Sequence, residues 1–285
     1  MKKNIVITGV SSGIGRDALR LLHSKGYHIY GSVRKEADAK SLTEAYPQRF
    51  TPLIFDVQDQ AGVTQAANIV FDECERIDAL INNAGIAVPG PLQFVKEEDF
   101  EKQMDINLKS VRRITNTFLP LLGATTDFKG KPGKIINISS ISGLLSVPFN
   151  GVYSISKHAL ESMTDVYRRE LRRYGIKVIA IEPGPIKTKI WGKNLNSMEQ
   201  FANTDYYDIL QKANKMIENT EKNAFPVSRT SDVILKCVTK KNPKTRYIVH
   251  KNVFIFKVFA NYFPDKLLDW FINRGLSKGN RHRPV

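Results

Sequence analysis

The sequence predicts an α/β protein with one domain, built on a doubly wound parallel sheet that carries helices on both faces. Over the first two thirds of the 285 residues, short β-branched runs alternate with segments of helical periodicity. This alternation is typical of parallel sheets whose strands are joined by crossover helices. The expected strands are also apolar almost throughout, which is the pattern of strands covered on both faces.

The elements follow from these two periodicities in chain order. The expected strands span residues 4–9, 27–34, 50–57, 78–85, 133–140, 176–184 and 245–250. The expected helices span residues 13–25, 37–45, 62–75, 99–122 and 152–174. In the first helix the apolar side chains recur at helical spacing, which places Ile14, Ala18, Leu21 and Leu22 on one face.

A polar segment of helical pattern, residues 191–224, follows the sixth strand. Because open α/β sheets bind ligands beyond the carboxyl ends of their strands, we expect a lid over the site at about 189–226. The main domain then spans 1–251. Residues 252–285 form a basic, aromatic-rich and amphipathic extension, for which we expect a helix packed on the domain, with contact to a membrane surface as the alternative.

Composition bounds the class of protein. Hydrophobic residues make up 42% and charged residues 25% of the chain, as in an ordinary globular protein. The net charge is +15, and Val227–Val285 carries 13 Lys and Arg against 3 Asp. A solvated basic face, an anionic substrate or membrane surface, and nucleic acid compete to explain this charge. We expect no nucleic-acid partner, because no nucleic-acid motif accompanies the charge.

Cysteine and histidine usage points away from disulfides and metals. Cys74 and Cys237 lack a nearby partner and are expected to be reduced thiols. The five histidines lack metal-ligand spacing, so no metal site is expected. The apolar run at residues 4–9 is too short for a secretory signal, and no run of about 18 apolar residues offers a membrane span. We expect a cytoplasmic protein, with peripheral membrane association as the variant.

The first strand leads into "TGVSSGIG", residues 8–15. Gly9 can leave the strand at dihedrals that a Cβ resists, Gly13 lets the backbone approach a phosphate, and Gly15 lets helix and sheet pack closely. The start of the following helix offers free N–H groups and a partial positive charge. This loop therefore predicts a site for the pyrophosphate of a dinucleotide.

A second stretch, "GVYSISKHAL" at 151–160, places Tyr153 and Lys157 on one helix face. A free tyrosine has a pKa of about 10, and a cation held close to the phenol lowers it. Tyr153 could then exchange a proton with an alcohol or carbonyl oxygen. A serine hydroxyl near the end of the 133–140 strand would hold that oxygen, and Ser139, Ser140 and Ser142 are the alternatives.

The glycine loop resembles the TGxxxGxG loop of the short-chain dehydrogenase/reductase family, and four more stretches agree with that family. They are the "NNAG" of 82–85, Asn107, Ser140 thirteen residues before Tyr153, and Pro183-Gly184 followed by Thr188. The resemblance covers residues 4 to 190. It implies a Rossmann-like fold and an NAD(P)-dependent alcohol dehydrogenase or carbonyl reductase, assembled as a homodimer or homotetramer through the helices at 99–122 and 152–174.

The resemblance also assigns residues. It implies a catalytic set of Ser140, Tyr153, Lys157 and Asn107, in which Asn107 helps to anchor a water linked to the lysine and Lys157 also holds the cofactor ribose. It implies cofactor contacts from Gly9, Ser11, Ser12, Gly13, Ile14, Gly15, Arg34, Asp56, Val57, Asn83, Ala84, Gly85, Tyr153, Lys157, Pro183, Gly184, Ile186 and Thr188.

The end of the second strand bears on the choice of cofactor. NAD-binding members carry an acidic residue there, which bonds the ribose hydroxyls. Here Val33 occupies that position and Arg34 follows. An apolar residue leaves room for a 2′-phosphate, and Arg34 can form charge-assisted bonds to it. We therefore expect NADP(H) rather than NAD(H).

The substrate is narrowed by "SGLLSVPFNGVYSISKHAL" and "PGPIKTKIW", which resemble the hydroxysteroid and retinol dehydrogenase branch. Leu145, Val147, Phe149 and Trp191 are the expected pocket walls, with Tyr206 or Tyr207 from the lid. An apolar pocket suits a lipophilic alcohol, ketone or aldehyde of steroid, retinoid or fatty type. The alternative function is a cofactor-sensing regulatory or scaffold protein of the same fold without turnover.

Overall fold

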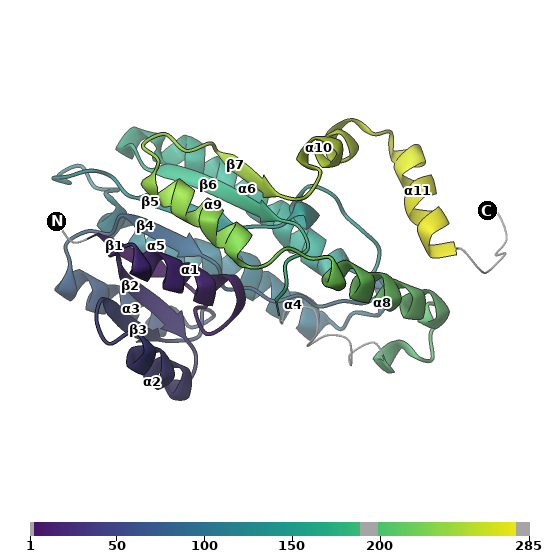
Figure 1. Cartoon of the computed structure of the whole chain (residues 1–285), viewed down its shortest axis with the longest axis horizontal. Helices are drawn as coiled ribbons and strands as arrows, with labels where there is room; N and C mark the ends of the chain where they lie inside the picture. The colour runs from purple at the N-terminus through teal and green to yellow at the C-terminus, as the bar shows by residue number, and fades with distance from the viewer. Residues whose placement is uncertain (1–2, 189–198, 278–285) are drawn as a thin grey trace.

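The computed structural model describes residues 3–188 and 199–277 of the chain (Figure 1). Its centre is a parallel sheet of seven strands in the order β3-β2-β1-β4-β5-β6-β7. All seven expected strands are present, each slightly shorter than the sequence indicated. They span β1 (Asn4–Ile7), β2 (His28–Val33), β3 (Phe50–Ile54), β4 (Ala79–Asn82), β5 (Lys134–Ile138), β6 (Lys177–Pro183) and β7 (Arg246–Val249).

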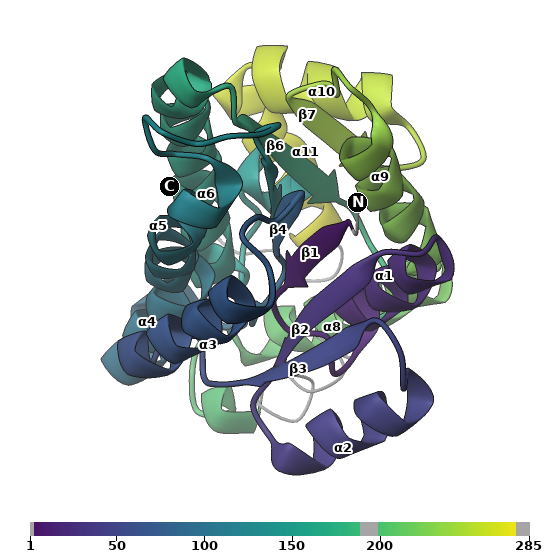
Figure 2. The same cartoon turned by 90° about the vertical axis from the view of Figure 1, so that its left-hand side faces the viewer.

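Helices cover both faces of the sheet, which confirms the doubly wound fold (Figure 2). One core cluster joins the sheet to α1 (Gly13–Ser24), α2 (Glu36–Ala45) and α9 (Ser228–Thr239). The other joins it to α3 (Gln60–Glu73), α5 (Ser110–Leu122) and the end of α6 (Gly151–Glu170). Alternate strand residues feed the two clusters, because Ile5 and Ile7 face the first and Val6 faces the second.

The strand order reverses between β1 and β4. From β1 the chain winds outward through β2 and β3, and then returns to β4 on the other side of β1. The loops after β1 and β4 therefore diverge to opposite faces, which opens a crevice at the carboxyl ends of the strands. Ligands of open α/β sheets bind at such a reversal point.

The long helix expected at 99–122 is interrupted. The structure has α4 (Glu97–Met104), a π-helical turn over Asp105–Lys109, and then α5. The sequence analysis did not anticipate this turn, in which the hydrogen bonds span five residues instead of four. Asn107 lies inside it, and π-turns are common at functional sites.

Helices beyond β6 complete the molecule. The described part of the expected lid contains α8 (Tyr207–Lys222), and α9 was not expected. Residues 252–277 form α10 (Val253–Tyr262) and α11 (Asp265–Ser277), and α11 contacts α8. Figure 1 shows α8 and α11 at the end of the molecule toward which the strands point. Among the described residues, none of the helices has the length and apolarity to cross a bilayer.

Candidate active site

A cleft of about 350 Å³ opens at the carboxyl ends of the strands, over the point where the strand order reverses. It brings together residues from stretches more than 170 positions apart in the chain, from Gly9 to Thr188. Most residues expected to contact a cofactor or to act in catalysis line it. They are Gly9, Ser11, Ser12, Gly13, Ile14, Arg34, Asp56, Val57, Asn83, Ala84, Gly85, Ser140, Tyr153, Lys157, Pro183, Gly184, Ile186 and Thr188.

The glycine loop has the backbone that its sequence indicates. Gly9 and Gly13 have φ of +72° and +60°, in the left-handed region that residues with a Cβ avoid. A Cβ on Gly13 would lie 3.6 Å from Cγ2 of Thr188, so this loop faces the loop after β6 across the cleft. Gly15 does not line the cleft. Its place in the helix leaves no space for a side chain, since a Cβ there would lie 2.2 Å from the Gly9 carbonyl oxygen.

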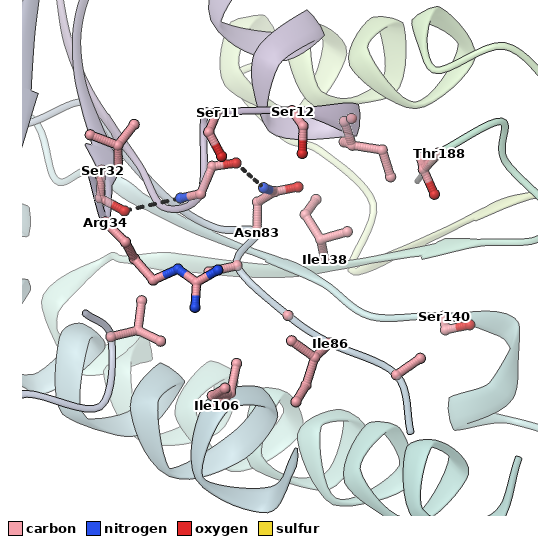
Figure 3. Close-up of a pocket in the computed structure, with 18 of the residues that line it drawn as sticks. Ser11, Ser12, Ser32, Arg34, Asn83, Ile86, Ile106, Ile138, Ser140 and Thr188 are labelled. Atoms are coloured by element: carbon pink, nitrogen blue, oxygen red, sulfur yellow. Dashed lines mark hydrogen bonds between the residues drawn. The ribbon is translucent and has the colours of Figure 1, made fainter. Parts of the chain in front are cut away.

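Three polar side chains hold the glycine loop against the neighbouring strands (Figure 3). The Oγ1 of Thr8 accepts hydrogen bonds from the backbone N–H groups of Asn83 and Ala84 at 2.9 and 3.0 Å. The side-chain amide of Asn83 donates back to the carbonyl oxygens of Thr8 and Gly9 at 2.9 and 3.0 Å. The Oγ of Ser32, on β2, accepts from the N–H of Gly9 at 3.0 Å. The loop is therefore fixed before any ligand binds.

Ser140, Tyr153 and Lys157 converge at the other end of the cleft. Ser140 caps the turn after β5 and accepts a hydrogen bond from the N–H of Ser142 at 3.1 Å. A hydrogen bond also joins the side chains of Ser140 and Tyr153. Among the three alternative serines, Ser140 is thus the one that contacts the phenol.

The electrostatics of the tyrosine differ from the prediction. We expected Lys157 to lower the pKa of Tyr153. Burial instead raises the pKa of this phenol to about 12, and the hydrogen bond from Ser140 opposes the rise only in part. The Nζ of Lys157 lies 5.6 Å from the centre of the tyrosine ring and donates a hydrogen bond to the carbonyl oxygen of Ile138 at 2.9 Å. Burial disfavours the charged phenolate, so the pKa of Tyr153 rises although an ammonium lies nearby.

Lys157 is itself perturbed. Burial lowers the pKa of its ammonium to about 8, while the carboxylate of Glu161 raises it. Its side chain is 5% exposed, so a charge here is costly unless partners hold it. Lys157 therefore changes its charge close to neutral pH rather than near its ordinary value.

Asn107 does not line the cleft but braces the loop that does. Its amide accepts from the N–H of Ile86 and donates to the carbonyl oxygen of Ile86, both at 2.9 Å. It also donates to the Oγ of Ser156 on α6 at 3.0 Å. A Cβ on Gly85 would meet Oδ1 of Asn107 at 3.2 Å and Nζ of Lys157 at 3.9 Å. The π-turn thus places Asn107 next to the lysine.

Arg34 stands at the far end of the cleft from Tyr153. Val33 ends β2 and is buried, whereas Arg34 is exposed and its guanidinium extends into the cleft (Figure 3). Lys35 lines the same corner. Arg34 and Lys35 thus place two cations at this corner, and cations attract a phosphate. The carboxylate of Asp38, which would repel a phosphate, also borders the corner.

The expected substrate walls do not line this cleft. Leu145 and Phe149 are half-buried and Val147 is 40% exposed. Phe149 packs against Tyr206 of the described lid with ring centres 5.9 Å apart, and Phe94, which the sequence did not single out, meets the same ring at 6.0 Å. Phe149 and Tyr206 also pack against the buried Phe201 and Leu210, which makes a small apolar cluster of its own. The expected wall residue Trp191 lies outside the described residues.

Several cleft residues were missed by sequence reasoning. Ser32 sits inside the expected second strand, and its polarity within an apolar run was the available signal. The others are mainly side chains from strand ends and the loop after β4, which carry no motif. They are Lys35, Asp38, Phe55, Ile86, Ala87, Ile106 and Ile138.

The residues fit a dinucleotide. Two glycines in the left-handed region, the start of α1 and the serines of the loop offer a phosphate cradle. Among the described residues, a Cβ built on Gly13 would have only Thr188 within 4 Å, at ordinary contact distance. At the opposite end, a serine and a tyrosine hydroxyl share a hydrogen bond beside an ammonium. Such a group can hold a substrate oxygen and exchange a proton with it.

Comparison with known families agrees with this geometry. A family model described as short chain dehydrogenase matches residues 3–199. An NADPH-dependent 3-dehydrocapnine reductase from Ornithobacterium rhinotracheale is 39% identical, over 96% of this chain and 97% of its own. A 3-ketodihydrosphingosine reductase from Bacteroides thetaiotaomicron is 33% identical, over 93% and 95%. Rat retinol dehydrogenase 7 is 30% identical, over 98% and 90%.

Solved structures share the fold. The structure titled "ElxO with NADP Bound" has a TM-score of 0.71 at 26% identity, covering 87% of this chain and 96% of its own.

Proposed function

The chain belongs to the short-chain dehydrogenase/reductase family, and from this premise we propose that it is an NADP(H)-dependent oxidoreductase that interconverts a lipophilic alcohol and its ketone or aldehyde. The single observation that carries the proposal is the convergence of Ser140, Tyr153 and Lys157 at one end of a cleft whose other end is the glycine loop. A scaffold protein of the same fold would not need this arrangement.

The proposed chemistry follows from the protonation states of these residues. With NADPH bound, the cofactor supplies the hydride. The raised pKa keeps Tyr153 protonated at neutral pH, so in reduction its O–H donates a proton to the substrate oxygen. The hydroxyl of Ser140 holds that oxygen in place. The ammonium of Lys157 stabilises the tyrosinate that forms, since an opposite charge nearby favours the charged form.

The preference for NADP(H) rests on the basic corner of the cleft. Arg34 and Lys35 line it and the buried Val33 offers no carboxylate to the ribose. A relative at 39% identity is named as NADPH-dependent, and a structural neighbour is titled as NADP-bound. We propose that Arg34 forms charge-assisted hydrogen bonds with the 2′-phosphate.

The substrate class is supported by the apolar cluster that includes Tyr206 and by two relatives. Phe149, which precedes Tyr153 by four positions in the chain, and Phe94 both pack against the ring of Tyr206 in the lid. One relative is named as a reductase of 3-dehydrocapnine and another as a reductase of 3-ketodihydrosphingosine. We propose a long-chain ketone as the substrate, reduced at the expense of NADPH.

The test is NADPH oxidation followed by absorbance with three carbonyl compounds: 3-ketodihydrosphingosine, retinal and butanone. We expect turnover with at least one lipophilic compound, at a kcat/KM well above that for butanone. Comparable values for butanone would contradict the substrate class. Tight NADPH binding without turnover on any compound would favour the cofactor-sensing alternative.

The C-terminal helices suggest where a lipophilic substrate would come from. Phe259, Phe263 and Phe271 pack together and join α10 to α11, with the first two rings stacked at 4.3 Å. Phe254 and Tyr262 instead remain 80% and 82% exposed. Other exposed side chains on the same helices are Leu267, Trp270, Lys257, Lys266 and Arg274.

Aromatic side chains beside cations are typical of helices that lie on an anionic bilayer. We propose that α10 and α11 bind the membrane surface peripherally, next to the lid helix that α11 contacts. Sedimentation with phosphatidylglycerol vesicles tests this: the double variant Phe254→Ser, Tyr262→Ser should sediment less than the wild type. Equal sedimentation of the two proteins would contradict the proposal.

We also propose a homodimer or homotetramer that assembles through α4–α5 and α6. On α6, Ile155 and Val166 are 39% and 45% exposed, so apolar surface is available on this helix. Light scattering on the eluted protein gives the mass directly. A single 32.2 kDa species at micromolar concentration would contradict this assembly.

A further inference from the structure

Four ionisable side chains on α6, β6 and β7 form a cluster that takes no part in the chemistry proposed above. Glu161 follows Lys157 by one turn on α6, and Asp165 follows by another. Glu182 precedes Pro183 at the end of β6 and is fully buried, and Arg246 begins β7. Burying a charge costs free energy unless an opposite charge or hydrogen bonds compensate for it, so the partners of these groups decide their protonation states.

One guanidinium serves all three carboxyl groups. The Nη2 of Arg246 lies 2.9 Å from Oε2 of Glu161, its Nη1 lies 2.8 Å from Oδ1 of Asp165, and its Nε lies 3.2 Å from Oε1 of Glu182. The charge of Glu161 also acts on Glu182, because it helps to raise the pKa of the buried Glu182 carboxyl group. Arg168 and Arg169 lie 3.2 and 3.4 Å from the carboxylate of Asp165 as well.

The protonation states of these groups follow from their burial and their charged neighbours. Burial, followed by the charge of Glu161, raises the pKa of Glu182 to about 8, so Glu182 is protonated at neutral pH. Although burial opposes it, Arg246 holds the pKa of Asp165 below its ordinary value, so Asp165 is ionised. Asp165 thus has three arginine partners, and Glu161 lies between Arg246, at 2.9 Å, and the buried Lys157 one helical turn away, whose pKa its charge raises.

Packing joins the cluster to the catalytic turn. A Cβ on Gly143 would lie 3.0 Å from Cγ of Glu161 and 3.0 Å from the carbonyl oxygen of Lys157. The turn that starts at Ser140 therefore rests directly on both residues. The hydroxyl of Ser140 also lies 3.5 Å from the carbonyl oxygen of Pro183, the neighbour of Glu182. Glu161 therefore lies against the turn that carries Ser140 and beside the backbone of Lys157.

We propose that Glu161 is a positioning residue for the reaction: its carboxylate, oriented by Arg246, is the counter-charge that keeps the buried Lys157 protonated. Removing this charge leaves an ammonium in a buried site without its partner, and such a group loses its proton instead. The inference rests on the proposed function, since Glu161 acts only through Lys157.

The groups that face this cluster are known for each element packed on it. They are Lys157, Asp165, Arg168 and Arg169 on α6, Glu182 on β6, Arg246 on β7 and Lys257 on α10. Glu161 is closer to Lys157 along α6 than any of the other cluster residues on that helix, since one helical turn separates the two. At such a spacing and an effective dielectric constant of about 20, with Arg246 offsetting part of the charge, its removal should shift the pKa of Lys157 by about one unit.

The experiment is the pH profile of kcat/KM for NADPH-dependent ketone reduction by the full chain. Lys157 must be charged, so the rate falls as pH rises through its pKa. In Glu161→Gln the midpoint of this alkaline limb should move about one pH unit lower, while Glu161→Asp, which keeps the charge, should stay near the wild type. Affinity for NADPH, followed by fluorescence titration, should weaken at the same lower pH in Glu161→Gln.

The matched control is Asp165→Asn, which also removes a carboxylate from Arg246 but lies a further turn from Lys157. Its limb should move by less than about 0.3 unit. Thermal melting of each variant establishes folding, and Glu161→Met replaces Glu161→Gln if that variant does not fold. An unmoved limb in the Glu161 variants, or an equal shift in Asp165→Asn, would overturn the inference. Absence of turnover in the wild type would instead overturn the proposed function.

Discussion

Replacing Gly15 by alanine tests the packing of the glycine loop most sharply, because two physical effects predict opposite signs. Gly15 lies in α1, where alanine normally stabilises a helix by up to about 1 kcal/mol. A Cβ at this position, however, would lie 2.2 Å from the Gly9 oxygen and 2.5 Å from Nδ2 of Asn83, well inside the 3.4 Å at which ordinary contact begins.

The magnitude follows from the hydrogen bonds that must be given up. To make room, Asn83 has to leave the carbonyl oxygens of Thr8 and Gly9, to which it donates at 2.9 and 3.0 Å. Two broken bonds at a partly buried site, offset by the helix preference, lower the free energy of unfolding by about 2–4 kcal/mol. Because the displaced loop is the phosphate cradle, the Kd for NADPH should also rise at least about tenfold, equivalent to about 1.4 kcal/mol.

Urea unfolding and fluorescence titration with NADPH measure both effects. Gly26→Ala is the control, because Gly26 has a φ of +82° and nothing within 4 Å of the added Cβ. It should lose about 1 kcal/mol from backbone strain and leave the Kd for NADPH unchanged. A Gly15→Ala protein as stable as the wild type, with an unchanged Kd, would refute the reasoning.

Three further predictions concern the cofactor, the buried carboxyl group and the core. Arg34→Ala should raise the Kd for NADPH about tenfold or more, since a charge-assisted hydrogen bond contributes about 1.5–3 kcal/mol. The Kd for NADH should stay within about twofold of the wild-type value. A variant that still prefers NADPH would exclude a role of Arg34 in binding the 2′-phosphate. The pKa of Glu182 is about 8 in the folded protein, against 4.5 in the unfolded chain. As pH rises from about 5 to 8, the free energy of unfolding of the wild type should therefore fall by a few kcal/mol relative to Glu182→Gln, measured in urea titrations. Parallel curves for the two proteins would show that Glu182 is ionised. Phe118→Ala, at a fully buried position of α5, should cost about 3–5 kcal/mol by the same method, and a loss below about 1 kcal/mol would mean that this core repacks freely.

Elements with strong local signals were predictable. The seven strands were found because their runs are apolar and β-branched, and α1, α3 and α6 because their apolar residues recur at helical spacing. The π-turn at Asn107 and the helix α9 were missed. The π-turn is a single turn inside one long helical pattern and carries no signal of its own, and α9 begins just after residue 226, which the sequence analysis took only as the end of the lid.

At the site, residues fixed by backbone geometry were predictable and residues fixed by burial were not. Gly9, Gly13 and the pair Tyr153–Lys157 could be read from spacing, because turn dihedrals and helix faces depend on local sequence. The raised pKa of Tyr153 could not, because it comes from atoms contributed by several strands and loops. Arg246 and Glu182 lie 64 residues apart and meet only through the pairing of β6 with β7.

The central claim is that Tyr153 transfers the proton between this protein and a substrate oxygen. The most direct test is the rate of NADPH oxidation with a lipophilic ketone, measured for the wild type and Tyr153→Phe after both are shown to bind NADPH equally. The phenol contributes general acid catalysis, so the variant should lose at least about 100-fold in kcat/KM. A variant that turns over within about twofold of the wild type would contradict the account.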